Sequence, residues 1–114
     1  MTKLPKSIFD LIDLESFRLR PAMYLQLKSI DILNAFIDGY QYALNSYKIK
    51  DDKNKRFEKF RGWVLQYYSR PVYTGGWKDL ILEDCKGDQQ KSVDQFFELY
   101  DQFKTSYSAL PHNK

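Results

Sequence analysis

Few residues in this chain have side chains suited to nucleophilic or acid–base chemistry. His112 is the only histidine and lies close to the end of the chain, and Cys85 is the only cysteine. A general base needs an oriented imidazole in a cleft, and a reactive thiol needs a base beside it. Neither residue has such a neighbour in the sequence. We therefore expect a tail histidine, a half-buried thiol at a helix end, no internal disulfide and no enzymatic activity.

Carboxylates gather at two places along the chain. Asp10, Asp13 and Glu15 lie close together near the start, and Glu83 and Asp84 are adjacent. Paired carboxylates carry out acid–base catalysis or bind hard cations such as Ca²⁺. The spacings of a calcium loop or of a His-Glu-x-x-His zinc motif do not occur here. Solvated helix faces explain these acids, so we predict neither a metal nor another cofactor.

The charges are unevenly distributed although the net charge is only +3. Residues 48–61 contain seven basic and three acidic residues, a net charge of +4. Residues 79–101 contain two basic and seven acidic residues, a net charge of −5. Such an asymmetry steers charged partners without defining a fold.

The basic segment 48–61 has two interpretations. Phe57, Phe60 and Trp63 are interleaved with its lysines and arginines, a pattern typical of nucleic-acid binding through phosphate contacts and base stacking. The same aromatic residues also have the spacing of a helix core, and three acids interrupt the basic run. A helical nucleic-acid-binding or regulatory protein therefore remains the alternative to a solvated helix.

The elements that must position these residues are helical. A first helix is expected from Ser7 to a point at or before Arg20, since the residue before a proline disfavours helical geometry. A turn follows over 20–25, and Ser29 is predicted to cap a second helix. Gly39 in that helix predicts the close approach of another element. The apolar seam of the second helix comprises Ile30, Leu33, Ile37, Tyr40, Leu44 and Tyr47.

Three more helices are expected beyond a polar loop at 48–55. They span about 56–68, about 75–85 with Thr74 as cap, and a last helix opened by a Ser92–Gln95 capping box after a turn at 86–88. Residues 108–114 are expected to form a flexible tail. No run alternates with period two. The predicted fold is an all-α, single-domain bundle of about five helices over residues 1–114, with a core that includes Phe57, Phe60, Val64, Tyr68 (or Tyr67), Trp77, Leu80, Ile81, Val93, Phe96, Phe97, Tyr100, Phe103 and Tyr107.

The composition suits a compact protein with an interface. Hydrophobic residues make up 43% and aromatic residues 17%, enough for one packed core, and the nine tyrosines exceed what that core needs. Tyrosines are enriched at protein interfaces. No stretch approaches the ~20 apolar residues of a membrane span, and the first residues lack the apolar run of a secretion signal. We therefore expect a cytoplasmic protein.

Six short motifs are spread along the chain, at Arg20–Leu25, Lys28-Ser29, Ala35–Tyr40, Phe57–Val64, Gly76-Trp77 and Phe96–Leu99. Together they resemble those of small bacterial proteins, some of which look like immunity proteins of contact-dependent inhibition systems with nuclease toxins. The resemblance covers nearly the whole chain and departs from the commoner pattern at Ala22 and Gln26, where glycines often stand.

The resemblance implies a non-catalytic protein that binds and neutralises a cognate toxin as a monomer in a 1:1 complex. Nuclease clefts are basic because they hold phosphates, so the acidic stretch is the predicted contact surface. Arg20 and Tyr24 are expected to tie their turn to the bundle. The alternative for the acidic stretch is a solvated face with Trp77 in the core. The predicted toxin-binding residues are Glu83, Asp84, Asp88, Asp94 and Glu98, with Tyr73 and Trp77 as aromatic anchors.

Overall fold

The chain forms a bundle of α-helices. The computed structural model describes residues 11–46, 52–70 and 76–109. Within these ranges there are six helices and no strand, which confirms the predicted all-α class. None of these helices has the length and apolar character required to cross a membrane. The helices are α2 (Glu15–Leu19), α3 (Pro21–Leu25), α4 (Ile30–Ser46), α5 (Asp52–Tyr67), α6 (Trp77–Asp84) and α7 (Gln89–Ala109).

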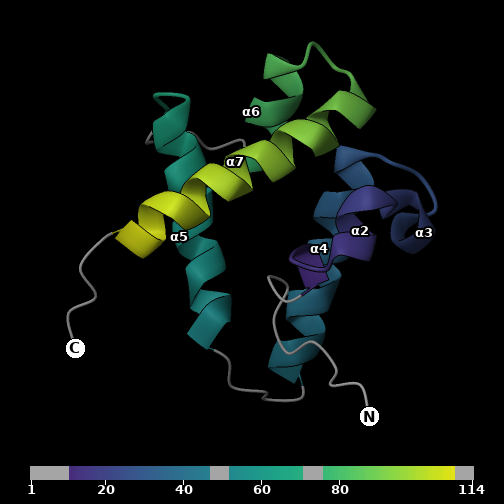
Figure 1. Ribbon diagram of the computed structural model, residues 1–114, viewed down its shortest axis with the longest axis horizontal. Helices are drawn as coiled ribbons and strands as arrows, with labels where there is room; N and C mark the ends of the chain where they lie inside the picture. The colour runs from purple at the N-terminus through teal and green to yellow at the C-terminus, as the bar shows by residue number, and fades with distance from the viewer. Residues whose placement is uncertain (1–10, 47–51, 71–75, 110–114) are drawn as a thin grey trace.

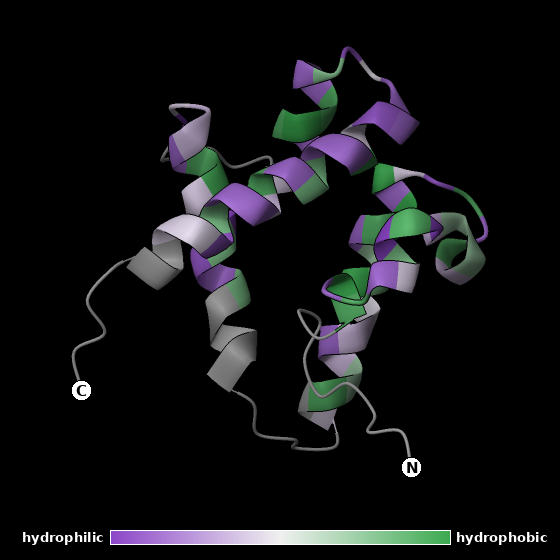
Figure 2. Ribbon diagram, in the orientation of Figure 1, coloured by the Kyte–Doolittle hydropathy of each residue, from purple (hydrophilic) through white to green (hydrophobic). Residues whose placement is uncertain are grey.

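The last helix organises the bundle. In Figure 1, α7 crosses the molecule and packs against α4, α5 and α6, while α2 and α3 lie on the side away from α5. Its outer face is hydrophilic, as the purple stretches in Figure 2 show. Its inner face is apolar because Val93, Phe96 and Phe103 recur at helical spacing and are buried.

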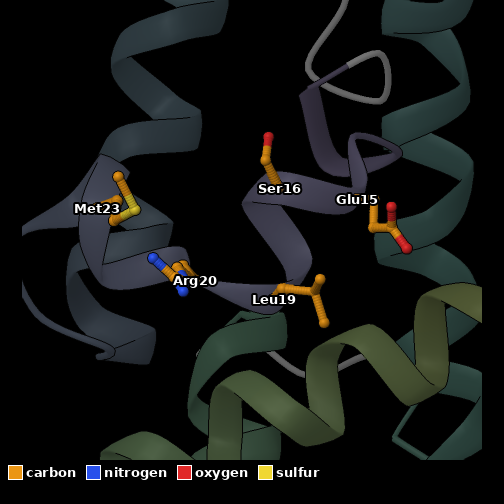
Figure 3. A pocket seen from close by; sticks show the side chains of 5 residues that line it. All are labelled: Glu15, Ser16, Leu19, Arg20 and Met23. Atoms are coloured by element: carbon orange, nitrogen blue, oxygen red, sulfur yellow. The ribbon is translucent and has the colours of Figure 1, made fainter.

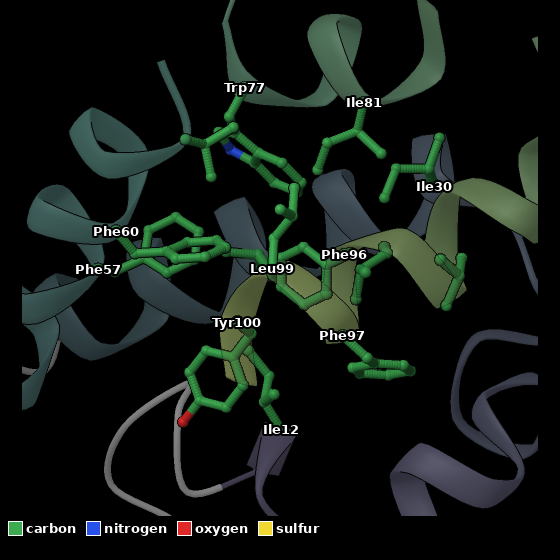
Figure 4. Close-up of a cluster of buried hydrophobic side chains, with 14 of the residues drawn as sticks. Ile12, Ile30, Phe57, Phe60, Trp77, Ile81, Phe96, Phe97, Leu99 and Tyr100 are labelled. Carbon is green, nitrogen blue, oxygen red and sulfur yellow. The ribbon is translucent and has the colours of Figure 1, made fainter. Parts of the chain in front are cut away.

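The core is rich in aromatic rings that contact one another. Phe96 lies at its centre (Figure 4) and meets Phe60 edge to face, with 5.5 Å between the ring centroids, and Trp77 at a tilt of 42°, with 5.2 Å between the centroids. Such pairs add about 0.5–1.5 kcal/mol beyond the burial of area. The predicted core is confirmed at most positions, with Tyr68 rather than Tyr67 turned inward. The confirmed buried residues are Ile30, Leu33, Ile37, Leu44, Phe57, Phe60, Val64, Trp77, Leu80, Ile81, Val93, Phe96, Phe97, Tyr100 and Phe103.

The segment predicted as a turn at 20–25 is instead the short helix α3. Pro21 occupies its first turn, where the fixed φ of proline favours a helix and its missing N–H is not needed. The preceding helix α2 ends at Leu19, as expected, but it begins only at Glu15 because Leu14 is extended, so the single first helix predicted from Ser7 is wrong. The Tyr24 hydroxyl lies 2.8 Å from Ser16 Oγ, and its ring meets Phe17 edge to face. Tyr24 therefore ties α3 to α2, as predicted, whereas the Arg20 side chain makes no ion pair or hydrogen bond among the described residues, so the same prediction for Arg20 is wrong.

The helix starts were predicted with mixed success. Ser29 does cap α4, since its Oγ accepts a hydrogen bond from Ile32 N at 3.3 Å. The Ser92 capping box is wrong: Ser92 lies inside α7, and Asp88 Oδ1 accepts the bond from Lys91 N at 2.9 Å. Asp88 follows a turn in which Gly87 has a φ of 83°, and this turn brings the carboxylate to the helix end.

Other boundaries also differ from the prediction. Helix α5 begins at Asp52, inside the predicted polar loop, and α7 continues to Ala109, inside the predicted tail. Gly39 is exposed, and a Cβ placed there meets nothing within 4 Å. The predicted close approach at Gly39 is therefore wrong. Ser7, Tyr47, Thr74 and residues 110–114 lie outside the described residues.

A polar network joins the first turns of α4, α6 and α7. Lys78 Nζ lies 2.7 Å from Asp31 Oδ1, and Gln89 Nε2 donates to Asp31 Oδ2 at 2.8 Å. The hydrogen bond from Lys78 lowers the pKa of Asp31, and the same bond raises the pKa of Lys78. Ser29 Oγ donates to Gln89 Oε1 at 2.8 Å, so the cap of α4 belongs to the same network.

Candidate protein-binding surface

The predicted contact residues that the structure describes lie on α6, on α7 and in the turn between them. The five carboxylates are all solvent-exposed, which a contact surface requires. Tyr73 lies outside the described residues. The exposed carboxylates are Glu83, Asp84, Asp88, Asp94 and Glu98.

Trp77 does not belong to this surface. Only 5% of it is exposed, and its ring packs against Phe57 and Phe96. As the first residue of α6, it points into the space between α5 and α7, where a large ring fills the core. The prediction of an aromatic anchor at Trp77 is therefore corrected to a core residue.

The last turn of α6 holds two exposed acids. Tyr68 donates a hydrogen bond to Asp84 Oδ2 at 2.9 Å, and Arg70 Nη2 lies 3.4 Å from Glu83 Oε1. Burial raises the pKa of Tyr68 well above its ordinary value, and the bond to Asp84 adds to the rise, so the phenol remains a donor. Acids at a helix C-terminus face the negative end of the helix dipole, which costs about 0.3–1 kcal/mol. Helix stability does not account for their presence there.

The acids of α7 form a second group along its outer face. Asp94 pairs with Lys28 at 2.7 Å, and Asp101 pairs with Arg18 at 2.9 Å. Glu98 lies between them, at helical spacings of four and three residues, and accepts a hydrogen bond from Gln102 at 3.2 Å. Arg18 and Lys28 therefore fix the orientation of this row from the side of α2 and α3.

The two groups of acids lie towards different edges of α7. Gln95 Nε2 contacts the Tyr68 hydroxyl on the α5 side, whereas Asp94 and Asp101 contact residues on the α2–α3 side. Asp88 lies between the two groups in the sequence, and its carboxylate caps α7 by accepting a hydrogen bond from Lys91 N. The structure thus divides the predicted surface into a Glu83–Asp84 group and an Asp94–Glu98–Asp101 row.

Each of these carboxylates keeps capacity for a further partner. An ionised carboxylate accepts up to about four hydrogen bonds, and the contacts above use one or two of them. The side chains of Glu83 and Asp94 are 67% and 66% exposed. The internal contacts therefore orient the oxygens without enclosing them, which lowers the entropy lost on binding.

Two aromatic residues of the basic segment do not offer their rings for stacking. Phe57 and Phe60 are buried in the core, so their rings are not accessible to bases. Arg61 is paired with Glu58 at 3.2 Å on the exposed side of α5. Residues 48–51 and the side chains of 52–56 lie outside the described residues.

Chemistry beyond charge pairing has little support in the described part of the chain. No group of three or more histidine, cysteine, aspartate or glutamate side chains is arranged there to hold a metal. Cys85 is half-buried at the end of α6, as predicted, and His112 lies outside the described residues. The arrangement supports recognition by oriented charges.

A second surface feature was not predicted. Leu19 and Met23, on α2 and α3, are 72% and 73% exposed and line a concavity of about 350 Å³ (Figure 3). Glu15, Ser16 and Arg20 complete its lining. The sequence did not indicate this concavity because each of the two helices has only five residues, too few for a periodic pattern of apolar residues.

Comparisons with protein-family models, with curated proteins and with solved structures gave no match to this chain. The resemblance to immunity proteins therefore stays a prediction from its sequence motifs.

Proposed function

We propose that this protein is a bacterial immunity protein that binds and neutralises a cognate toxin, a nuclease, in the cytoplasm. The observation that carries the proposal is the set of exposed carboxylates held in fixed orientations on α6 and α7. These carboxylates cover part of the toxin's substrate-binding surface, and one chain binds one toxin domain.

The physical basis of the proposal is charge complementarity. A nuclease cleft carries lysines and arginines that contact phosphates, and carboxylates bind the same side chains through charge-assisted hydrogen bonds. Such acceptors are offered by Glu83 and Asp84 on α6 and by Asp94 and Glu98 on α7. Complementary charges raise the association rate, and reversing rim charges lowers that rate and the salt dependence of binding.

The proposal is tested with the toxin domain encoded next to this gene. Binding of the purified pair is measured by calorimetry for the native chain, for Glu83→Lys with Asp84→Lys, and for Asp94→Lys with Glu98→Lys. We expect at least one of the double variants to raise the Kd about tenfold or more, equal to about 1.4 kcal/mol. Loss of protection against toxin expressed in the same cell should accompany the weaker binding.

A control variant tests a charge reversal that lies away from the proposed contact surface. Glu58 is an exposed glutamate on α5 that pairs with a neighbouring arginine, much as Glu83 does. Glu58→Lys should leave toxin affinity unchanged. If both double variants bind the toxin as tightly as the native chain does, the proposed contact surface is wrong.

The alternative nucleic-acid-binding function makes the opposite prediction. Neutralising Lys53, Lys55 and Arg56 should abolish retention of nucleic acid if that alternative holds, and should leave toxin binding unaffected. The burial of Phe57 and Phe60 removes two of the three rings that the interpretation assigns to stacking, and Trp63 is partly buried.

A further inference from the structure

Exposed apolar side chains concentrate in one short part of the described chain. Seven large hydrophobic residues are exposed over the whole described chain, and five of them lie between residues 14 and 27. The two most exposed of the five, Leu19 and Met23, line the concavity on α2 and α3. Grouped apolar exposure of this kind marks interaction sites more often than scattered single residues do.

The rim of this concavity carries one cation and one anion. Figure 3 shows Glu15 towards one end and Arg20 towards the other, with Ser16 and Leu19 between them. Among the described residues, neither Glu15 nor Arg20 has an ion-pair partner, whereas nearby Arg18 and Lys28 are both paired with acids of α7. The face thus presents one uncompensated charge of each sign at opposite ends of an apolar hollow.

This pattern is complementary to itself. A two-fold axis through the middle of the concavity exchanges its two ends, so Arg20 of each copy meets Glu15 of the other. The same operation brings the apolar lining of one copy, Leu19 and Met23, against the apolar lining of the other. A partner of a single charge sign would leave one of the two rim charges unpaired and desolvated, at a cost.

We propose that the α2–α3 concavity is the interface of a two-fold homodimer of this chain. Leu19 and Met23 fill the contact, and two Arg20–Glu15 ion pairs close its rim. This inference does not depend on the proposed toxin. The acids on α6 lie near Tyr68 and Arg70, on the α5 side of the bundle, so a dimer leaves them free to bind a partner.

The test measures the mass of the purified chain by sedimentation equilibrium at protein concentrations from about 1 to 500 µM. This range covers the dissociation constants expected for a small, weak interface. The mass should rise with concentration from 13.6 kDa towards twice that value. Met23→Glu should raise the dimer Kd at least about tenfold. Tyr42→Glu is the matched control, since Tyr42 is 75% exposed on α4, and it should leave the Kd unchanged. Circular dichroism verifies that each variant is folded.

The rim charges give a second and more specific readout. Arg20→Glu alone places the new carboxylate of each copy opposite Glu15 of the other copy, and this repulsion should weaken the dimer. Glu15→Arg alone places two cations opposite each other and should weaken it likewise. The double variant Arg20→Glu with Glu15→Arg restores opposite charges and should recover most of the affinity. A chain that stays monomeric over the whole concentration range overturns the proposal. This outcome includes the case in which a different protein binds this face. A dimer that both single charge variants leave unchanged overturns the proposed register.

Discussion

Helix α7 and the α2–α3 pair differ in how far their apolar side chains are buried. Along the 21 residues of α7, the apolar side chains Val93, Phe96 and Phe103 are buried because three other helices pack against that face. In α2 and α3, five residues each, Phe17 and Leu25 are buried while Leu19 and Met23 are exposed. A short helix with few neighbours has more apolar side chains than buried positions.

This difference separates what holds the molecule together from what it offers to others. Burial of a large apolar side chain contributes about 1.5–3 kcal/mol, so the stability resides around α7. The exposed residues of α2 and α3 contribute little to the folded monomer. Substitutions in the two regions should therefore differ sharply in their effect on unfolding.

The largest expected difference is between Phe96→Ala and Met23→Ala. Phe96 is fully buried at the centre of the aromatic core, and its truncation should lower the free energy of unfolding by about 3–5 kcal/mol. Met23→Ala should change it by less than about 0.5 kcal/mol at protein concentrations where the chain is monomeric. Urea unfolding followed by circular dichroism measures both. Similar losses for the two variants would contradict the assignment of stability to α7.

A medium effect distinguishes two acids that are both exposed. Asp88→Ala removes the cap of α7 and should cost about 1 kcal/mol, within the known range of about 0.5–2. Asp94→Ala removes only an exposed ion pair with Lys28 and should cost less than about 1 kcal/mol. The same unfolding measurement compares them. If Asp94→Ala is the more damaging variant, the ion pair is structural rather than available to a partner.

Substitution of two glycines by alanine should change the stability of the protein in opposite directions. Gly39 lies exposed inside α4 with open space around its Cα, so Gly39→Ala should stabilise the protein by about 0.4–1 kcal/mol. Gly87 has a φ of 83° in the turn before α7, so Gly87→Ala should destabilise it. Thermal unfolding of both variants provides the comparison. A destabilised Gly39→Ala variant would show that another element does pack there.

The smallest expected effect is the pH dependence of the Asp31–Lys78 pair. Because the pKa of Asp31 in the folded protein lies below its ordinary 3.8, the pair stabilises fully above that pH and loses its contribution as the pH falls through the folded-state pKa. The Lys78 side of the pair is lost only above its ordinary pKa of 10.5, since that pKa is raised. With Asp31 half exposed, Asp31→Asn should cost less than about 1 kcal/mol near neutral pH.

The measurement for this pair is the difference in unfolding free energy between the native chain and Asp31→Asn from about pH 6 to pH 2.5, a range that spans the ordinary carboxylate pKa. The difference should shrink towards the acid end. A difference that stays constant with pH would assign the effect to the hydrogen bond from Gln89 rather than to the charge.

The amino-acid sequence was sufficient to predict the long helices and most of the core. Residues such as Ile30, Leu33 and Ile37 recur at the helical period, and a long amphipathic helix has one way to bury them. The cap at Ser29 was also readable, because capping is a local hydrogen bond. The cap at Ser92 was misassigned because α7 begins earlier, at Gln89, where the turn at Gly87 brings the Asp88 carboxylate to the helix end.

The candidate surface depended on information that a linear pattern does not carry. The sequence marked the acids of 79–101 as one stretch, but their pairing with Tyr68, Arg70, Lys28 and Arg18 joins residues distant in the chain and divides them into two groups. Trp77 was compatible with a surface or a core position until α5 and α7 were placed on either side of it. Helical periodicity, a local property, was determined by the sequence alone; only the tertiary structure decided which side chains stay exposed, because burial depends on the neighbours that folding brings to each face.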